Sequence, residues 1–243
     1  YLEDLFSWRA NSIFLLITGV IVFILFYIFL PETNKKIEEL KIGLSKEEKF
    51  SIKKIWKKYR SVFKRKKFLA AAICIVLLFS AQIAYLVVVP FLFSMMQFDE
   101  IYFGWFLLAT ESGFLVGAII LSTVSEKIKS YVLIDLGLLI ALASSFFMLV
   151  FSYIYVLNIY NILIPMFVYM VGIGFIFPQQ LAICLQGFTR NIGIASAILQ
   201  GLRVAGAGII VVFVEKMNLK NQIPLSYIMF VLTVMALVVF FTF

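Results

Sequence analysis

The stretch MFVYMVGIGFIFPQQLAICLQGFTRNIGIASAILQGLRVAGAGIIVVF, residues 166–213, decides the fold. It consists of two apolar segments of helical length joined by a short polar turn. The first segment carries Gly172, Gly174 and Pro178, which predict either a helix that can bend or one with a static kink. The second carries a single charged residue, Arg203, near its middle. A charge there costs several kcal/mol unless it faces protein or water, so the stretch predicts two packed membrane helices with a buried cation.

Small side chains recur every four residues in the second segment, at Gly193, Ala197, Gly201 and Ala205. On a helix this spacing places them along one face, where the backbone of another helix can approach closely. We interpret this face as a helix-packing surface.

The composition extends this interpretation to the whole chain. Of 243 residues, 63% are hydrophobic and 14% are charged, whereas soluble domains have about 45–50% apolar and about 25% charged residues. A membrane span needs roughly 20 apolar residues, and the chain provides seven such segments. They lie at residues 11–30, 68–93, 102–124, 131–154, 161–185, 192–214 and 222–243. The sequence therefore predicts an all-α polytopic membrane helix bundle with seven transmembrane helices.

Basic residues lie mainly in one segment between the first two spans, residues 34–67, and this segment fixes the predicted orientation. With the loops on the same side, which contain Lys127, Lys129 and Arg190, this side has seventeen basic residues against three on the other. Cytoplasmic loops carry the excess of Lys and Arg, so we expect the linker in the cytoplasm. Because the net charge of +8 comes from residues beside the membrane, it does not indicate nucleic-acid binding.

The linker has a helical pattern of its own. Ser45 and Glu48 fit a capping box, and apolar residues at helical spacing alternate with lysines between Ile52 and Phe63. We interpret this segment as an amphipathic helix on the inner leaflet of the lipid bilayer. A regulatory, calmodulin-like binding role is the less favoured alternative.

Several kinds of chemistry have no residues to support them. The chain contains no His, and its two cysteines, Cys74 and Cys184, fall within apolar spans, so we expect buried, inert thiols. The Gly-x-Gly at Gly172 lies in a span, and neither a nucleophile–base set nor a phosphate-binding loop is present. We expect no enzymatic activity, no cofactor and no metal site.

Glu111 and Arg203 are the leading candidates for a functional site. Glu111 lies nine residues into its span and Arg203 eleven residues from the end of its own, which places them at depths of about 14 Å and about 16 Å. A carboxylate at mid-depth can take up and release a proton. The two residues are interpreted as a proton-coupling or substrate-contact pair, or as two charges satisfied separately by backbone, water or lipid headgroups.

Other residues in the spans have weaker claims. Gln82 is expected to hydrogen-bond either a ligand or another helix, and Asp135, four residues into its span, is favoured as a solvated interfacial carboxylate. Aromatic residues are expected either to line a ligand pocket or to pack against lipid and protein. Those considered are Tyr85, Phe106, Phe114 and Phe175.

Four sets of motifs resemble those of a known family. They are Ser7-Trp8-Arg9 before a span that closes with Leu30-Pro31-Glu32-Thr33, Tyr59-Arg60 before Lys66-Lys67-Phe68-Leu69, Pro90-Phe91 before Phe103-Gly104, and Gly174 to Pro178 before Gly193-Ile194-Ala195-Ser196-Ala197. The family is the major facilitator superfamily, and within it the Bcr/CflA group of drug:proton antiporters. The last set is the most specific and resembles the junction of the tenth and eleventh helices.

The resemblance implies residues 1–33 as the sixth helix of a twelve-helix transporter, 34–67 as its cytoplasmic linker, and 68–243 as its C-terminal six-helix bundle. It implies export of drug-like small molecules in exchange for protons, by alternating access, in the bacterial inner membrane. The chain is then expected to be a piece of a longer protein, with the N-terminal half as its partner. An importer of a small metabolite and an inactive or split remnant are the alternatives.

Overall fold

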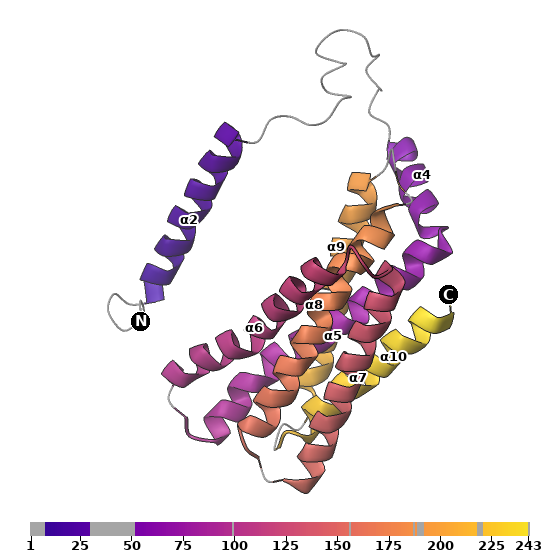
Figure 1. Ribbon diagram of the computed structural model, residues 1–243. Coiled ribbons are helices and arrows are strands. Elements are labelled where there is room, and N and C mark those ends of the chain that lie inside the picture. The colour runs from indigo at the N-terminus through magenta and orange to yellow at the C-terminus, as the bar shows by residue number, and fades with distance from the viewer. Residues whose placement is uncertain are drawn as a thin grey trace. The chain divides into compact units, whose positions relative to one another are not determined.

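The computed structural model describes residues 8–29, 52–98, 100–155, 157–186, 188, 192–217 and 221–242. Within these ranges all regular structure is α-helical (Figure 1), which confirms the predicted fold class. The capping box at Ser45 and Glu48, the linker lysines from Lys35 to Lys49, Pro31 and the polar turn at Arg190 lie outside the described residues.

The chain divides into two units, Tyr1–Ile52 and Lys53–Phe243. The first contains α2 (Trp8–Phe29), which is apolar on all sides. The second is a helix bundle whose elements are α4 (Ile52–Phe63), α5 (Lys66–Met95), α6 (Glu100–Val124), α7 (Ser130–Ile154), α8 (Tyr160–Gln186), α9 (Ile192–Glu215) and α10 (Ile223–Thr242).

Seven of the described helices are long and apolar enough to cross a membrane: α2 and the six from α5 to α10. They match the seven predicted spans to within a few residues at each end. A helix satisfies its own backbone hydrogen bonds, which is what the hydrocarbon core of a bilayer requires. Pro90, Pro165 and Pro178 all lie inside helices that continue past them. Beside Pro165, the hydroxyl of Ser144 on α7 donates a hydrogen bond to its carbonyl oxygen.

The bundle is built around α5 and α8, which contact each other. Helices α7 and α10 pack together and cover one side of this pair, while α6 packs on α8 and α9 packs on α5. Polar side chains add bonds inside the apolar interior: Ser152 on α7 donates to Ser226 on α10 at 2.8 Å. The arrangement leaves α6 and α9 with the least protein cover among α5–α10.

Both cysteines are free and buried, as the sequence predicts. Cys74 on α5 accepts a hydrogen bond of 3.0 Å from the side-chain amide of Gln180 on α8. This bond ties the two central helices together at one end of the bundle.

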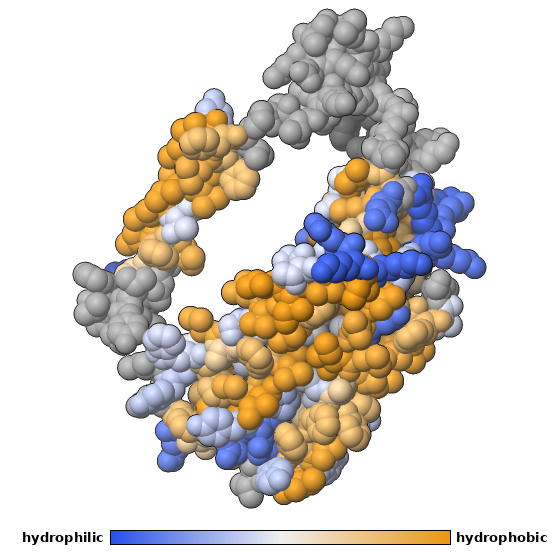
Figure 2. Space-filling model, in the orientation of Figure 1, coloured by the Kyte–Doolittle hydropathy of each residue, from blue (hydrophilic) through white to orange (hydrophobic). Residues whose placement is uncertain are grey.

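Helix α4 is amphipathic, as predicted, and its C-terminal part is joined to the bundle. Val62 is fully buried in a cluster with Phe68 of α5 and Ile198 of α9, whereas Trp56 is 73% exposed. In the second unit, Figure 2 shows hydrophilic side chains gathered around α4 and hydrophobic side chains along the sides of the bundle. The location of α4 at a membrane surface stays a prediction.

Candidate functional site

Glu111 lies half-buried on α6 and is held by Gln82 of α5. The amide nitrogen Nε2 of Gln82 lies 3.4 Å from Oε1 and 3.3 Å from Oε2 of the carboxylate, so it donates to both oxygens. Of the two alternatives for Gln82, the structure therefore displays the contact with another helix. That contact places an acid inside an apolar span with one neutral donor as its partner.

Arg203 lies half-buried on α9 between two aromatic rings. Its guanidinium carbon is 4.2 Å from the ring centre of Phe79 on α5 and 5.3 Å from that of Phe177 on α8. Its Nη1 donates to Oε1 of Gln200 at 3.2 Å, and its Nε is buried without a hydrogen-bond partner in the described part of the chain. The cation is therefore stabilised mainly by aromatic faces.

The acid and the guanidinium belong to one continuous set of contacts. On α5, Phe79 lies one helical turn from Gln82, and on α6, Phe114 lies one turn from Glu111. The ring centre of Phe114 is 6.5 Å from that of Phe177 on α8. We call this set the polar–aromatic network. It comprises Phe79, Gln82, Glu111, Phe114, Phe177 and Arg203, all half-buried. It joins α5, α6, α8 and α9 on the side of the bundle away from α7 and α10.

Within the described residues no ion pair joins Glu111 and Arg203. The direct pair that the sequence left open is therefore not formed in this conformation. Helices α5 and α8 lie between α6 and α9. Gln82 of α5 therefore contacts the carboxylate of Glu111. Phe79 of α5 and Phe177 of α8 contact the guanidinium of Arg203. The two charges are satisfied separately, but by protein groups within one network.

Tyr85 and two of the three candidate pocket phenylalanines lie in the protein interior. Tyr85 is fully buried and its hydroxyl donates to Oγ1 of Thr110 at 3.2 Å. Phe106 and Phe175 are each 8% exposed. Of the four aromatic candidates, Phe114 is the one that is half-buried, and it belongs to the polar–aromatic network. The Tyr85 bond is a second polar link between α5 and α6, next to Glu111, and its role in substrate contact stays a prediction.

Gly172 and Gly174 allow α8 to approach two neighbours closely. A Cβ atom at Gly172 would lie 2.7 Å from the carbonyl oxygen of Gly137 on α7, and one at Gly174 would lie 2.6 Å from that of Phe114 on α6. Only glycine fits at such contacts. These glycines therefore pack helices, and the bending role assigned to them and to Pro178 stays a prediction.

The other sequence candidates fall at the edges of the bundle. Asp135 is half-buried, and its Oδ1 is buried without a hydrogen-bond partner among the described residues. The small-residue face of α9 is not packed: Gly193, Ala197, Gly201 and Ala205 are all exposed. No described helix of the second unit packs on this face, so the predicted packing surface has no partner there.

Among the buried polar residues that sequence reasoning missed is Gln180. Its side chain is fully buried and its Oε1 has no hydrogen-bond partner in the described ranges. The signal was available, because Gln179 and Gln180 are adjacent polar residues inside an apolar span.

The chemistry that the polar–aromatic network offers is proton exchange at Glu111 and binding of flat or anionic groups beside Arg203. Among the described residues no three His, Cys, Asp or Glu side chains gather as a metal site would require.

One family model matches the chain, over residues 1–211, and it describes the Major Facilitator Superfamily. No curated protein matches the chain.

Proposed function

Because this chain belongs to the Major Facilitator Superfamily, a family of membrane transporters, we propose that it forms part of a proton-coupled exporter of drug-like small molecules, of the Bcr/CflA group. The observation that carries the proposal is the polar–aromatic network. Charged residues in membrane spans are costly and mark transport pathways by default. Here an acid and a guanidinium lie at mid-span in one connected set of half-buried side chains.

In this mechanism Glu111 carries the proton. The ionised carboxylate accepts hydrogen bonds from Gln82, and protonation weakens these bonds because it removes the charge. The link between α5 and α6 then loosens at the site where a substrate enters. Proton movement is coupled to export if the ionised and protonated states of Glu111 favour different conformations of the transporter, one open to each side of the membrane.

Arg203 and its two rings supply the substrate contact. A planar aromatic compound can stack on Phe79 or Phe177 in place of the guanidinium, and an anionic group can pair with Arg203 itself. Drug-like compounds usually combine such flat and charged parts. The half-buried state of all three side chains makes them accessible to a bound molecule.

The proposed setting is the bacterial inner membrane, with residues 34–67 as the cytoplasmic linker. The excess of basic residues on that side supports this orientation. Residues 1–33 are proposed as the sixth helix and 68–243 as the C-terminal bundle, with an N-terminal half as the partner. The exposed apolar side chains of α6 and α9, such as Leu115 and Ile209, supply a surface for that half.

The test of the proposal is the substitution Glu111→Gln in the full-length transporter. This change keeps the size of the side chain and its hydrogen bonding but removes the titrating group. We expect export of a fluorescent drug-like compound to lose its dependence on the proton gradient and on pH, while binding of the compound persists. Export is followed in everted membrane vesicles with an imposed gradient.

The matched control is Glu126→Gln, which makes the same change at an exposed residue in the loop after α6. It is expected to export like the unaltered protein. Unchanged pH dependence in Glu111→Gln would remove Glu111 from the mechanism. Accumulation of the compound in intact cells, instead of in everted vesicles, would indicate an importer.

A further inference from the structure

A cavity of about 310 Å³ opens at the end of the bundle where α5 and α7 begin. This volume lies at the lower end of the range for small-molecule pockets, about 300–1,000 Å³. Four helices form its wall: Lys67 and Ala71 come from α5, Tyr131 from α7, Gln180 from α8, and Phe240 from α10. The polar–aromatic network contributes none of the residues that line it.

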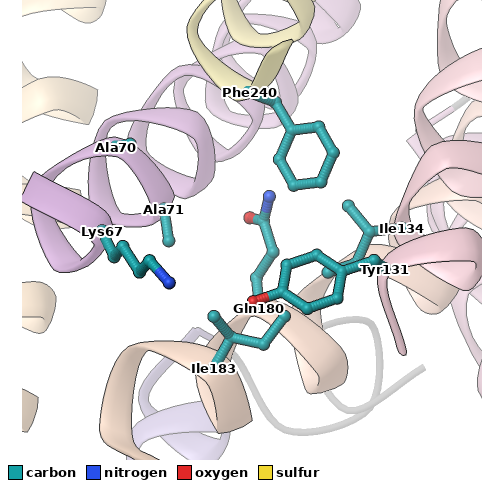
Figure 3. Close-up of a pocket in the computed structure, with 8 residues that line it drawn as sticks. All are labelled: Lys67, Ala70, Ala71, Tyr131, Ile134, Gln180, Ile183 and Phe240. Carbon is teal, nitrogen blue, oxygen red and sulfur yellow. The ribbon is translucent and has the colours of Figure 1, made fainter. Parts of the chain in front are cut away.

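The buried end of this cavity presents an amide that is only half satisfied. The Nε2 of Gln180 donates to Sγ of Cys74, whereas its Oε1 is buried and has no partner among the described residues. Figure 3 shows the amide between Ala71, Tyr131 and Phe240, pointing into the middle of the cavity. A buried acceptor without a partner costs about 1–3 kcal/mol. The cavity therefore favours a ligand that brings a hydroxyl group to this position.

The open end presents a positive charge and a hydroxyl. Lys67 and Tyr131 are both exposed, and Figure 3 shows the ammonium of Lys67 and the hydroxyl of Tyr131 turned toward the cavity. Both groups donate hydrogen bonds, and an ammonium beside a hydroxyl suits a phosphate oxygen.

A second cavity, of about 510 Å³, shares Lys67, Tyr131 and Ile183 with the first and therefore adjoins it. It adds Arg65, whose guanidinium carbon lies 4.3 Å from the ring centre of Phe188. None of the described residues that line either cavity is acidic. The pair of cavities therefore has a positive, donor-rich entrance.

The position of the entrance indicates where the ligand comes from. Lys66 is the first residue of α5 and of the apolar span that α5 forms, so the entrance lies where the bundle meets the membrane–water boundary. Phospholipid headgroups occupy that depth, and basic pockets between membrane helices bind anionic headgroups.

We propose that these two cavities bind the headgroup of an anionic phospholipid that carries hydroxyl groups, of the phosphatidylglycerol class. The phosphate lies between Lys67 and the Tyr131 hydroxyl, and a headgroup hydroxyl bonds the free amide oxygen of Gln180. The acyl chains stay in the bilayer. A choline headgroup lacks a hydrogen-bond donor for Gln180 and adds a positive charge beside Lys67.

The test compares lipids on the unaltered full chain in a neutral detergent. Phosphatidylglycerol and phosphatidylcholine with the same acyl chains are added, and retained lipid is counted by native mass spectrometry while the thermal midpoint is recorded. We expect retention and a raised midpoint with phosphatidylglycerol only. Equal retention of both lipids would overturn the proposal, and so would stabilisation by soluble glycerol 1-phosphate equal to that by the lipid.

Variants then locate the site. Lys67→Gln is expected to weaken phosphatidylglycerol binding about tenfold, the loss of one charge-assisted contact. Gln180→Leu, which removes the free oxygen at similar volume, is expected to weaken it as well. Lys64→Gln is the control, because Lys64 is exposed and lines neither cavity. Binding unaffected by Lys67→Gln, or weakened equally by Lys64→Gln, would refute the assignment.

Discussion

At the scale of single residues, Glu111 and Arg203 each have partners suited to their charge. Glu111 has the amide of Gln82, and Arg203 has two rings and the amide oxygen of Gln200. Neutral partners leave each charge free to exchange with a proton or a ligand. A tight ion pair between the two would have hindered that exchange, because each would hold the other.

The aromatic cage around Arg203 gives a prediction at this scale. Arg203→Lys keeps the positive charge but loses the planar group that stacks between Phe79 and Phe177. We expect the free energy of unfolding in detergent to fall by about 0.5–2 kcal/mol, the range of a cation–π contact. Thermal unfolding followed by circular dichroism measures the change.

Arg60→Lys on the exposed surface of α4 is the matched control and is expected to leave the unfolding midpoint where it was. If Arg203→Lys were as stable as the unaltered chain, the rings would be neighbours of the guanidinium without stabilising it.

At the scale of helices, glycines decide which neighbours approach closely. The contacts of α8 with α6 and α7 are tight because Gly174 and Gly172 face backbone atoms of those helices. By contrast, a Cβ at Gly201 of α9 would meet nothing within 4 Å. The same residue type therefore has opposite consequences on two helices of one bundle.

Gly174→Ala and Gly201→Ala test this difference directly. The new methyl group of Gly174→Ala lies against Phe114 and Ala118 of α6, and we expect a loss of about 1–3 kcal/mol, as overpacking costs. Gly201→Ala is expected to be neutral or to stabilise α9 by up to about 1 kcal/mol, through helix propensity. Denaturation of the purified chain compares the two. Equal stabilities would mean that α6 and α8 can separate at no cost.

At the scale of the molecule, the bundle is covered unevenly. Large apolar side chains on α6 and α9 are exposed, among them Leu108, Leu115, Val204 and Ile209. The small-residue face of α9 is exposed beside them. In a membrane, small residues let helices associate closely, so this side of the bundle is suited to a partner.

We predict that the chain, purified alone, self-associates, and that co-expression with an N-terminal half yields a one-to-one complex. Gly201→Leu is expected to reduce recovery of the complex without unfolding the chain, because a large side chain prevents close approach. Size-exclusion chromatography with light scattering measures both effects.

Ala143→Leu on α7, another exposed small residue, is the matched control and is expected to leave complex formation intact. A stable, monodisperse monomer of the chain alone would contradict the prediction.

The sequence alone determined the seven spans, the all-helical class and the free buried cysteines. The physical reason is that each of these depends on composition along the chain. About twenty apolar residues fill a bilayer and must be helical to satisfy their backbone. Counting residues from the ends of the spans also places Glu111 and Arg203 at mid-depth.

Only the tertiary structure decided how each helix is rotated about its own axis. Apolar spans such as α5 and α10 lack a polar face that would fix this rotation from sequence, so close packing fixes it. That rotation buries Tyr85, brings Gln82 to Glu111 across 29 positions of sequence, and places Phe79 and Phe177 around Arg203. It also turns Gln180 into its cavity.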